Sequence, residues 1–137
     1  MKPTLLYEVA AVLFVVFAAG HTLGFLKFMP PTAEGVAARD AMNNAHFQIG
    51  GTTVTYGRLY TGFGLFVTVY LLFSAYLAWH LGAVAARDPA AIGTLGWVFF
   101  AAQLANVALS WIYFFLPPRV LSTLIVLCVG WACLLVS

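Results

Sequence analysis

Residues 20–31 read GHTLGFLKFMPP and complete an apolar run that begins near residue 4. The whole run, residues 4–28, is long enough to cross the hydrocarbon core of a bilayer, and the two prolines after it stop helix propagation. His21 lies inside the run, where ionisable side chains are costly. Gly20 and Gly24 flank it at a spacing that lets another helix come close. The stretch therefore predicts a first membrane span that carries a candidate site.

The composition extends this prediction to the whole chain. Of the 137 residues, 64% are apolar and only 7% are charged, whereas soluble domains have about 25% charged residues. Three further apolar runs, at about residues 58–85, 89–116 and 120–136, predict three more spans, with residues 117–119 as the turn between the last two. We predict an all-α membrane protein with a single domain, an antiparallel four-helix transmembrane bundle.

The connection at residues 29–57 is longer than a bundle requires, and long loops are usually functional. Thr32 is an expected N-cap. The apolar residues at helical spacing after it are Ala38, Met42, Ala45 and Ile49. They predict a short amphipathic surface helix between spans one and two that breaks at Gly50 and Gly51. Residues 52–56, which follow and are rich in β-branched side chains, are expected to be extended.

Basic residues are unequally divided between the two predicted sides of the membrane. The loop side has Lys27, Arg39, Arg58 and Arg119, and the side of the termini has Lys2 and Arg87. The positive-inside tendency places the loop side in the cytoplasm and both termini outside, in a bacterial inner membrane. The basic residues are scattered, so we expect membrane lipid as a partner and no nucleic acid.

Polar residues on the predicted third span form one stripe. Gln103, Asn106, Ser110 and Tyr113 recur at helical spacing, and an unpaired amide in hydrocarbon costs several kcal/mol. On the second span, Arg58 and Thr61 lie at a similar depth. Together with His21 they predict a ligand pocket that opens toward the loop side. The alternative is that these groups serve only as hydrogen bonds between helices.

Two histidines are candidates for chemistry. His21 or His46 is positioned in the sequence to act as a general acid or base near the loop side of the membrane. No HxxxH or HExxH spacing connects them, so no metal site is predicted, and the sequence identifies no cofactor.

A family resemblance is carried by three short patterns. They are His21–Gly24, the Ala41–Met42 pair followed by Phe47 and Gly50–Gly51, and Tyr60–Leu65. These features resemble those of small bacterial four-helix membrane proteins of unassigned function, and the general build is similar to DoxX-like proteins. The resemblance implies the four-helix architecture and transfers no catalytic residue.

The leading functional hypothesis is a protein that binds a hydrophobic, partly polar ligand, such as a lipid, quinone or pigment, or that acts as an accessory subunit of a larger membrane complex. Small residues on several predicted spans favour close helix contacts within the chain or in a homo-oligomer. The alternatives are an enzyme that acts on a lipid-like substrate with a histidine acid or base, and an oligomeric transporter of small molecules.

Overall fold

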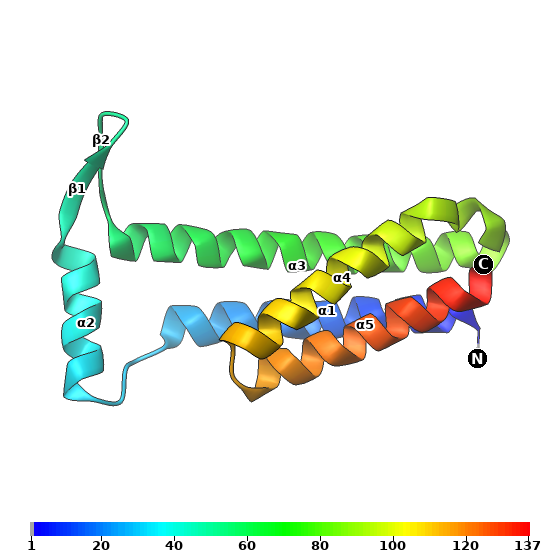
Figure 1. Ribbon diagram of the computed structural model, residues 1–137, viewed down its shortest axis with the longest axis horizontal. Helices are drawn as coiled ribbons and strands as arrows, with labels where there is room; N and C mark the ends of the chain where they lie inside the picture. Colours follow the sequence, from blue (N-terminus) through cyan, green and yellow to red (C-terminus); the bar gives the residue numbers. More distant parts are fainter. Residues whose placement is uncertain (1) are drawn as a thin grey trace. The chain divides into compact units, whose positions relative to one another are not determined.

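The computed structural model describes residues 2–137, which form helices, one short hairpin and the short segments that connect them (Figure 1). In chain order the elements are α1 (Pro3–Lys27), α2 (Ala33–Asn44), β1 (His46–Ile49), β2 (Thr52–Thr55), α3 (Tyr56–Arg87), the 3₁₀ helix η1 (Pro89–Ile92), α4 (Gly93–Tyr113) and α5 (Leu116–Val136). The segments Pro3–Lys27, Tyr56–Arg87, Pro89–Tyr113 and Leu116–Val136 are long and apolar enough to cross a membrane. The predicted all-α class is confirmed.

The chain divides into two compact units. Unit 1 contains the chain up to Ala18 together with Leu71–Ser137, and unit 2 contains Ala19–Tyr70. Helices α1 and α3 therefore contribute to both units, whereas α4 and α5 belong to unit 1 alone.

Unit 1 has one apolar core, to which α1, α3, α4 and α5 all contribute. Small residues are frequent in it: Ala10, Ala11, Ala18, Ala75, Ala78, Ala85 and Ala132 are all buried. Helix axes approach closely where side chains are small, because dispersion contacts between membrane helices increase as backbones come together. Gly82 of α3 illustrates this, since an added Cβ would lie 3.4 Å from the Thr4 carbonyl oxygen of α1.

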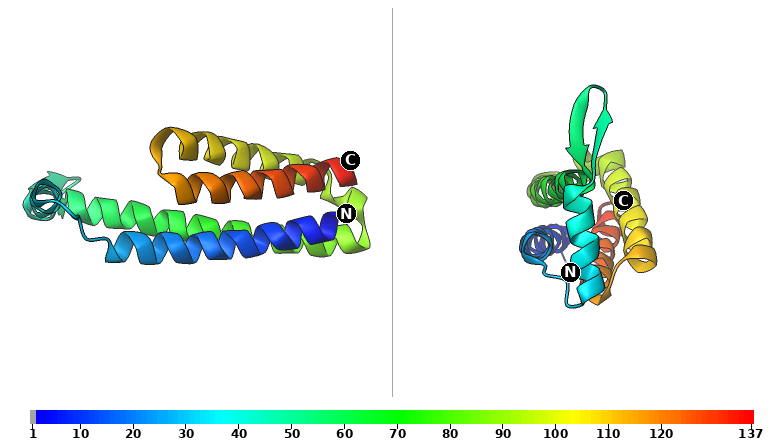
Figure 2. Two further views of the ribbon diagram at one scale, coloured as in Figure 1. Left: turned by 90° about the horizontal axis from the view of Figure 1, so that it is seen from below. Right: turned by 90° about the vertical axis from the view of Figure 1, so that its left-hand side faces the viewer.

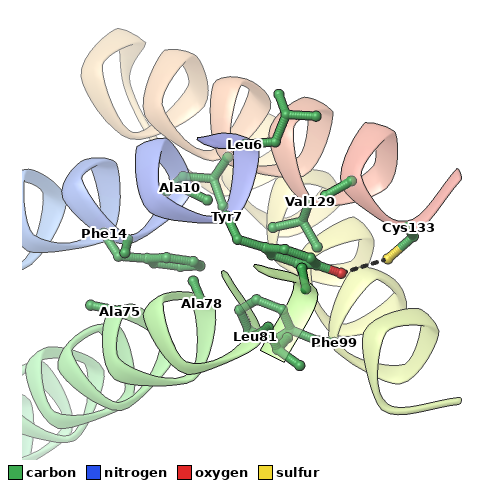
Figure 3. Packing of buried hydrophobic residues seen from close by; sticks show 14 of the residues in the cluster. Leu6, Tyr7, Ala10, Phe14, Ala75, Ala78, Leu81, Phe99, Val129 and Cys133 are labelled. Atoms are coloured by element: carbon green, nitrogen blue, oxygen red, sulfur yellow. Dashed lines mark hydrogen bonds between the residues drawn. The ribbon is translucent and has the colours of Figure 1, made fainter. Parts of the chain in front are cut away.

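Tyr7 lies at the centre of this core (Figure 3). Its side chain is fully buried, and its hydroxyl lies 3.5 Å from Cys133 Sγ of α5. Gly96 of α4 leaves the space beside this pair, since a Cβ there would lie 3.1 Å from the hydroxyl and 3.3 Å from the sulfur. This contact joins the beginning of α1 to the end of α5.

Helices α4 and α5 lie side by side (Figure 2). The turn between them is at Phe114 and Phe115, so the predicted turn at residues 117–119 is wrong. Pro117 and Pro118 instead occupy the first turn of α5, where the backbone N–H groups that proline lacks would have no partner within the helix. The fourth apolar helix is therefore longer than predicted.

The connection in unit 2 contains a helix and a hairpin (Figure 1). As predicted, Thr32 caps α2, accepting a hydrogen bond from the Gly35 N–H at 3.1 Å. The helix ends at Asn44, so the prediction that it continues to Ile49 is wrong. His46–Ile49 is a strand that pairs antiparallel with Thr52–Thr55, of which only the second was expected to be extended.

Two glycines explain the hairpin. Gly50 and Gly51 have φ values of 57° and 80°, and a two-residue turn with positive φ at both positions matches the twist of paired strands. Phe47 then packs on Tyr56 with ring centroids 4.6 Å apart. Thr55 at the end of β2 accepts a hydrogen bond from the Arg58 N–H at 3.2 Å, which caps the first turn of α3.

The first prediction concerns the space beside Tyr7. Substituting Gly96→Ala brings a methyl group within 2.8 Å of Ile92 Cγ2 and against the Tyr7 hydroxyl. We expect a loss of about 1–3 kcal/mol in the free energy of unfolding, because an overpacked core must shift. The measurement is unfolding by dodecyl sulfate in mixed micelles, followed by circular dichroism.

The matched control is Gly62→Ala on α3, where no atom lies within 4 Å of the added methyl group. That variant should be unchanged or more stable by up to about 1 kcal/mol, because alanine favours the helix. If both substitutions changed the free energy of unfolding equally, the close packing of Gly96 against Tyr7 would not be important for stability.

Candidate functional site

His21 lies in unit 2 and joins α1 to α3. Its Nε2 donates a hydrogen bond to the Gly64 carbonyl oxygen at 3.0 Å, because a carbonyl oxygen can only accept. The imidazole also stacks on Phe25, with ring centroids 5.2 Å apart and 25° between the planes. His21 is therefore held in a defined orientation, with Nε2 carrying a proton.

Two threonines lie beside this contact. Thr68 Oγ1 donates to the same Gly64 carbonyl oxygen at 3.3 Å, and it lies 2.8 Å from Thr22 Oγ1. Hydrogen bonds between membrane helices typically contribute about 0.6 kcal/mol each. His21 and Thr22 of α1 are thus hydrogen-bonded to Gly64 and Thr68 of α3.

The glycine that allows this approach is not one of those that flank His21. No atom lies within 4 Å of a Cβ built at Gly20 or at Gly24, so the expectation that they receive a neighbouring helix is not met within this chain. A Cβ at Gly64 would instead lie 2.6 Å from the Phe25 ring. Phe25 packs directly on the α3 backbone, and this places the imidazole beside it within reach of the Gly64 carbonyl group.

A hollow of about 490 Å³ lies within unit 2 beyond this contact. It is half open, and the end of α1, the residues before α2, one face of α2 and the first turns of α3 border it. Apolar and aromatic side chains form most of its wall: Phe25, Leu26, Phe28, Pro30, Pro31, Ala38, Met42 and Tyr60. The polar side chains on the wall are Thr32, Arg39, Asn43 and Thr61.

Arg39 supplies the positive charge of the hollow. Its Nη1 donates to the Phe28 carbonyl oxygen at 3.3 Å and lies 2.9 Å from Met29 Sδ. A carbonyl group and a thioether carry no charge, so these partners orient the guanidinium without neutralising it.

Arg58 and Thr61 lie next to the hollow on α3. With Asn43, Gly57, Gly62 and Leu65 they line a shallow depression that shares Asn43, Gly57 and Thr61 with the hollow. The Asn43 side chain covers Gly57, where any larger residue would clash with it. Thr61 Oγ1 donates to the Gly57 carbonyl oxygen at 3.0 Å. Of the predicted ligand-binding residues, Arg58 and Thr61 therefore lie in or beside a concave surface.

The predicted stripe on the third span belongs to unit 1. Gln103 and Ser110 are buried, Asn106 is half-buried, and Tyr113 is 74% exposed. Asn106 Nδ2 donates to Gln103 Oε1 at 3.3 Å. Since His21, Arg58 and Thr61 are in unit 2, a single pocket built from both sets of residues stays a prediction.

His46 lies on the exposed hairpin, where its Nδ1 donates to the Asn44 carbonyl oxygen at 2.8 Å. Neither His46 nor His21 is among the residues that line the hollow. Within residues 2–137, no three His, Cys, Asp or Glu side chains are grouped so that they could hold a metal ion.

The sequence analysis missed most of the hollow. Arg39 was counted only as a charge, and Phe25 and Met42 were not assigned to the site. A signal was present, because Ala38 and Met42 share a helical face with Gly35 and lie between two aromatic segments. Periodicity identifies such a face but does not show what it packs against.

The fold and the hollow define the class of this protein as all-α, with four helices able to cross a membrane and a partly polar hollow next to two of them. No family model, curated protein or solved structure matches the chain. The similarity in build to DoxX-like proteins therefore stays a prediction.

The second prediction tests the contact at Gly64. Substituting Gly64→Ala places a methyl group against the Phe25 ring, so this ring must shift, and we expect the neighbouring His21 imidazole to lose its hydrogen bond. We expect the His21 imidazole in the wild type to show an Nε2 proton that exchanges slowly with solvent. In the variant this proton should exchange fast, as measured by ¹⁵N NMR of histidine-labelled protein.

Gly62→Ala, two residues away on the same helix, is the control. No atom lies within 4 Å of its added methyl group, so the His21 signal should not change. A Gly64→Ala variant that keeps the slowly exchanging proton would show that His21 does not depend on the close approach at Gly64.

Proposed function

We propose that this protein binds a hydrophobic, partly polar ligand in the hollow of unit 2, and that the ligand is lipid-like, a quinone or a pigment. The observation that carries the proposal is the hollow itself, whose volume of about 490 Å³ lies within the range of small-molecule sites. Such sites combine mostly apolar walls with a few polar groups that orient the ligand, and this wall has that composition.

The distribution of polar groups favours an amphiphile. A long apolar portion would lie against Phe25, Leu26 and Met42, and a polar or acidic head would reach Arg39 and Asn43. A charged head is best placed at the membrane surface, because transfer of charge into hydrocarbon is costly. Residues 28–32 follow the end of α1, which supports the proposal that they lie at this surface.

The membrane arrangement is part of the same proposal. We propose that the four apolar helices form an antiparallel bundle in a bacterial inner membrane and that α2 lies along its cytoplasmic surface. Support comes from the helix lengths and from the excess of basic residues on the side of α2.

The third prediction tests the proposed orientation in the membrane. In the variant Gln48→Cys the exposed β1–β2 turn region carries a thiol, and in Ala90→Cys the exposed end of η1 does. In intact spheroplasts a membrane-impermeant maleimide should label Ala90→Cys and not Gln48→Cys. The parent protein should remain unlabelled, because Cys128 and Cys133 lie within an apolar helix.

Permeabilisation should make Gln48→Cys reactive and so confirm that the thiol is accessible. The reverse pattern, with Gln48→Cys labelled in intact spheroplasts, would place the loop side outside the cell and contradict the proposed orientation.

One further observation favours a second proposal, assembly into a homo-oligomer or a larger complex as an accessory subunit. On α1, Gly20 and Gly24 are exposed four residues apart, on the same face as the exposed Val12 and Val16, and glycines at this spacing receive partner helices in membranes. Native mass spectrometry in mild detergent distinguishes a monomer from an oligomer and would reveal other subunits.

The fourth prediction tests the hollow. Ala38→Phe adds a ring on the wall of the hollow, whereas Ala37→Phe adds the same ring to an exposed position of α2 outside it. After purification in mild detergent, small molecules retained by each variant are extracted and quantified by mass spectrometry. We expect Ala38→Phe to lower retention of the ligand by about tenfold, a loss of about 1.4 kcal/mol in binding.

The Ala37→Phe control should retain the ligand as the wild type does. If both variants retain it equally, the ligand does not occupy the hollow. If the wild type retains no molecule, the same comparison is made with added long-chain fatty acid, phosphatidylglycerol and a prenylated benzoquinone.

A further inference from the structure

A second cationic site lies in unit 1, at the turn between α4 and α5. Arg119 is in the first turn of α5, and its guanidinium carbon lies 5.6 Å from the centre of the Trp111 ring of α4. A guanidinium over an indole face is attracted by the ring electrons, so its position is defined.

Three hydrogen bonds fix the groups around this guanidinium. The Trp111 indole N–H donates to Thr123 Oγ1 at 3.1 Å, and the Thr123 hydroxyl donates to the Arg119 carbonyl oxygen at 2.7 Å. Ser122 Oγ donates to the same carbonyl oxygen at 3.1 Å. The ring below the cation and the backbone that carries it are thus held by one network.

The charge of Arg119 has no acidic partner within unit 1. Residues 89–137 contain no Asp or Glu, and the acidic residues of this unit are Glu8 and Asp88. Glu8 follows Tyr7, which contacts Cys133, 14 residues along α5 from Arg119, or about 21 Å at the helical rise. Asp88 precedes η1 and α4, whose 21 residues span about 30 Å.

One donor of this side chain is also unsatisfied. Among the buried side-chain nitrogen and oxygen atoms of residues 2–137, Nε of Arg119 is the one without a hydrogen-bond partner. Buried polar groups are normally paired, and each exception calls for an explanation. Since Nε itself is buried, an oxyanion would be bound by the Nη groups of this guanidinium, which is held in place and has no counter-charge within unit 1.

The surroundings indicate where that oxyanion comes from. The residues of the turn are large, apolar and exposed: Tyr113, Phe114, Phe115 and Leu116. Exposed aromatic residues at the end of a membrane-crossing helix lie at the depth of the lipid head groups. At this depth the most abundant oxyanion is the phosphodiester of a phospholipid.

We propose that Arg119, positioned on Trp111, binds a phosphate group, and that its source is a phospholipid head group. The helix N-terminus contributes little, because Pro117 and Pro118 have no N–H to offer. The Arg119 site uses no residue of the hollow in unit 2, so this proposal does not depend on the ligand proposed for the hollow.

The test compares two lipids with the same acyl chains. Phosphatidylglycerol carries the phosphate, and diacylglycerol lacks it. Each is titrated into detergent-solubilised protein and its binding is counted by native mass spectrometry. The measurement is made with the wild type and with an Ala38→Phe background that fills the hollow. We expect phosphatidylglycerol to bind about tenfold more tightly than diacylglycerol in both.

Arg119→Gln should abolish that preference, and Arg87→Gln, an exposed arginine at the end of α3, should retain it. Arg119→Lys keeps the positive charge but cannot stack on the indole ring or form two parallel hydrogen bonds to a phosphate. It should therefore retain about a third of the preference, and it provides the test if Arg119→Gln does not fold.

Competition by inorganic phosphate distinguishes the two sources of the phosphate group. Lipid binding that resists inorganic phosphate supports the phospholipid, and displacement of the lipid supports a site filled by the free ion. A preference that survives in Arg119→Gln, or that matches the wild type in Arg119→Lys, or that is absent from the wild type, overturns the proposal.

Discussion

The need to satisfy one polar group in an apolar core organises unit 1. Tyr7 is fully buried, so its hydroxyl must find a partner inside the protein, and Cys133 of α5 is that partner. Gly96 of α4 makes the arrangement possible, because a side chain there would occupy the same space. One tyrosine thus fixes the relative positions of three helices, and the alanine-rich faces of α1 and α3 can then pack at short range.

Features that depend on neighbouring residues could be predicted from the sequence. Long apolar runs indicated four helices, and Thr32 indicated the start of α2, because capping is decided within one turn. The hairpin was also predictable, since Gly50 and Gly51 between Phe47 and Val54 form a pattern typical of a two-residue turn. It was missed because the helical spacing of Ala38 and Met42 was extended through Ala45 to Ile49.

Features that depend on helix rotation could not be predicted. The spacing of Gly20 and Gly24 shows that they share a face of α1, but it does not show that this face is open while Gly64 of α3 receives Phe25. The hollow has the same limitation, because its walls come from α1, α2 and α3 and exist only once these have packed. Periodicity determines which residues are together on a helix, and packing determines what they meet.

Both proposed binding sites use an arginine where an apolar helix meets the polar surface, and there is a physical reason for this. A guanidinium deep in the membrane would cost several kcal/mol, whereas one in water would be screened and would select little. Uncharged groups can orient the charge, as the Phe28 carbonyl group does for Arg39 and the Trp111 ring does for Arg119. A cation oriented by uncharged partners keeps its full attraction for an anion. The two arginines therefore differ from a surface lysine in having both a defined direction and an unneutralised charge, which is the combination that binding a lipid-like head requires.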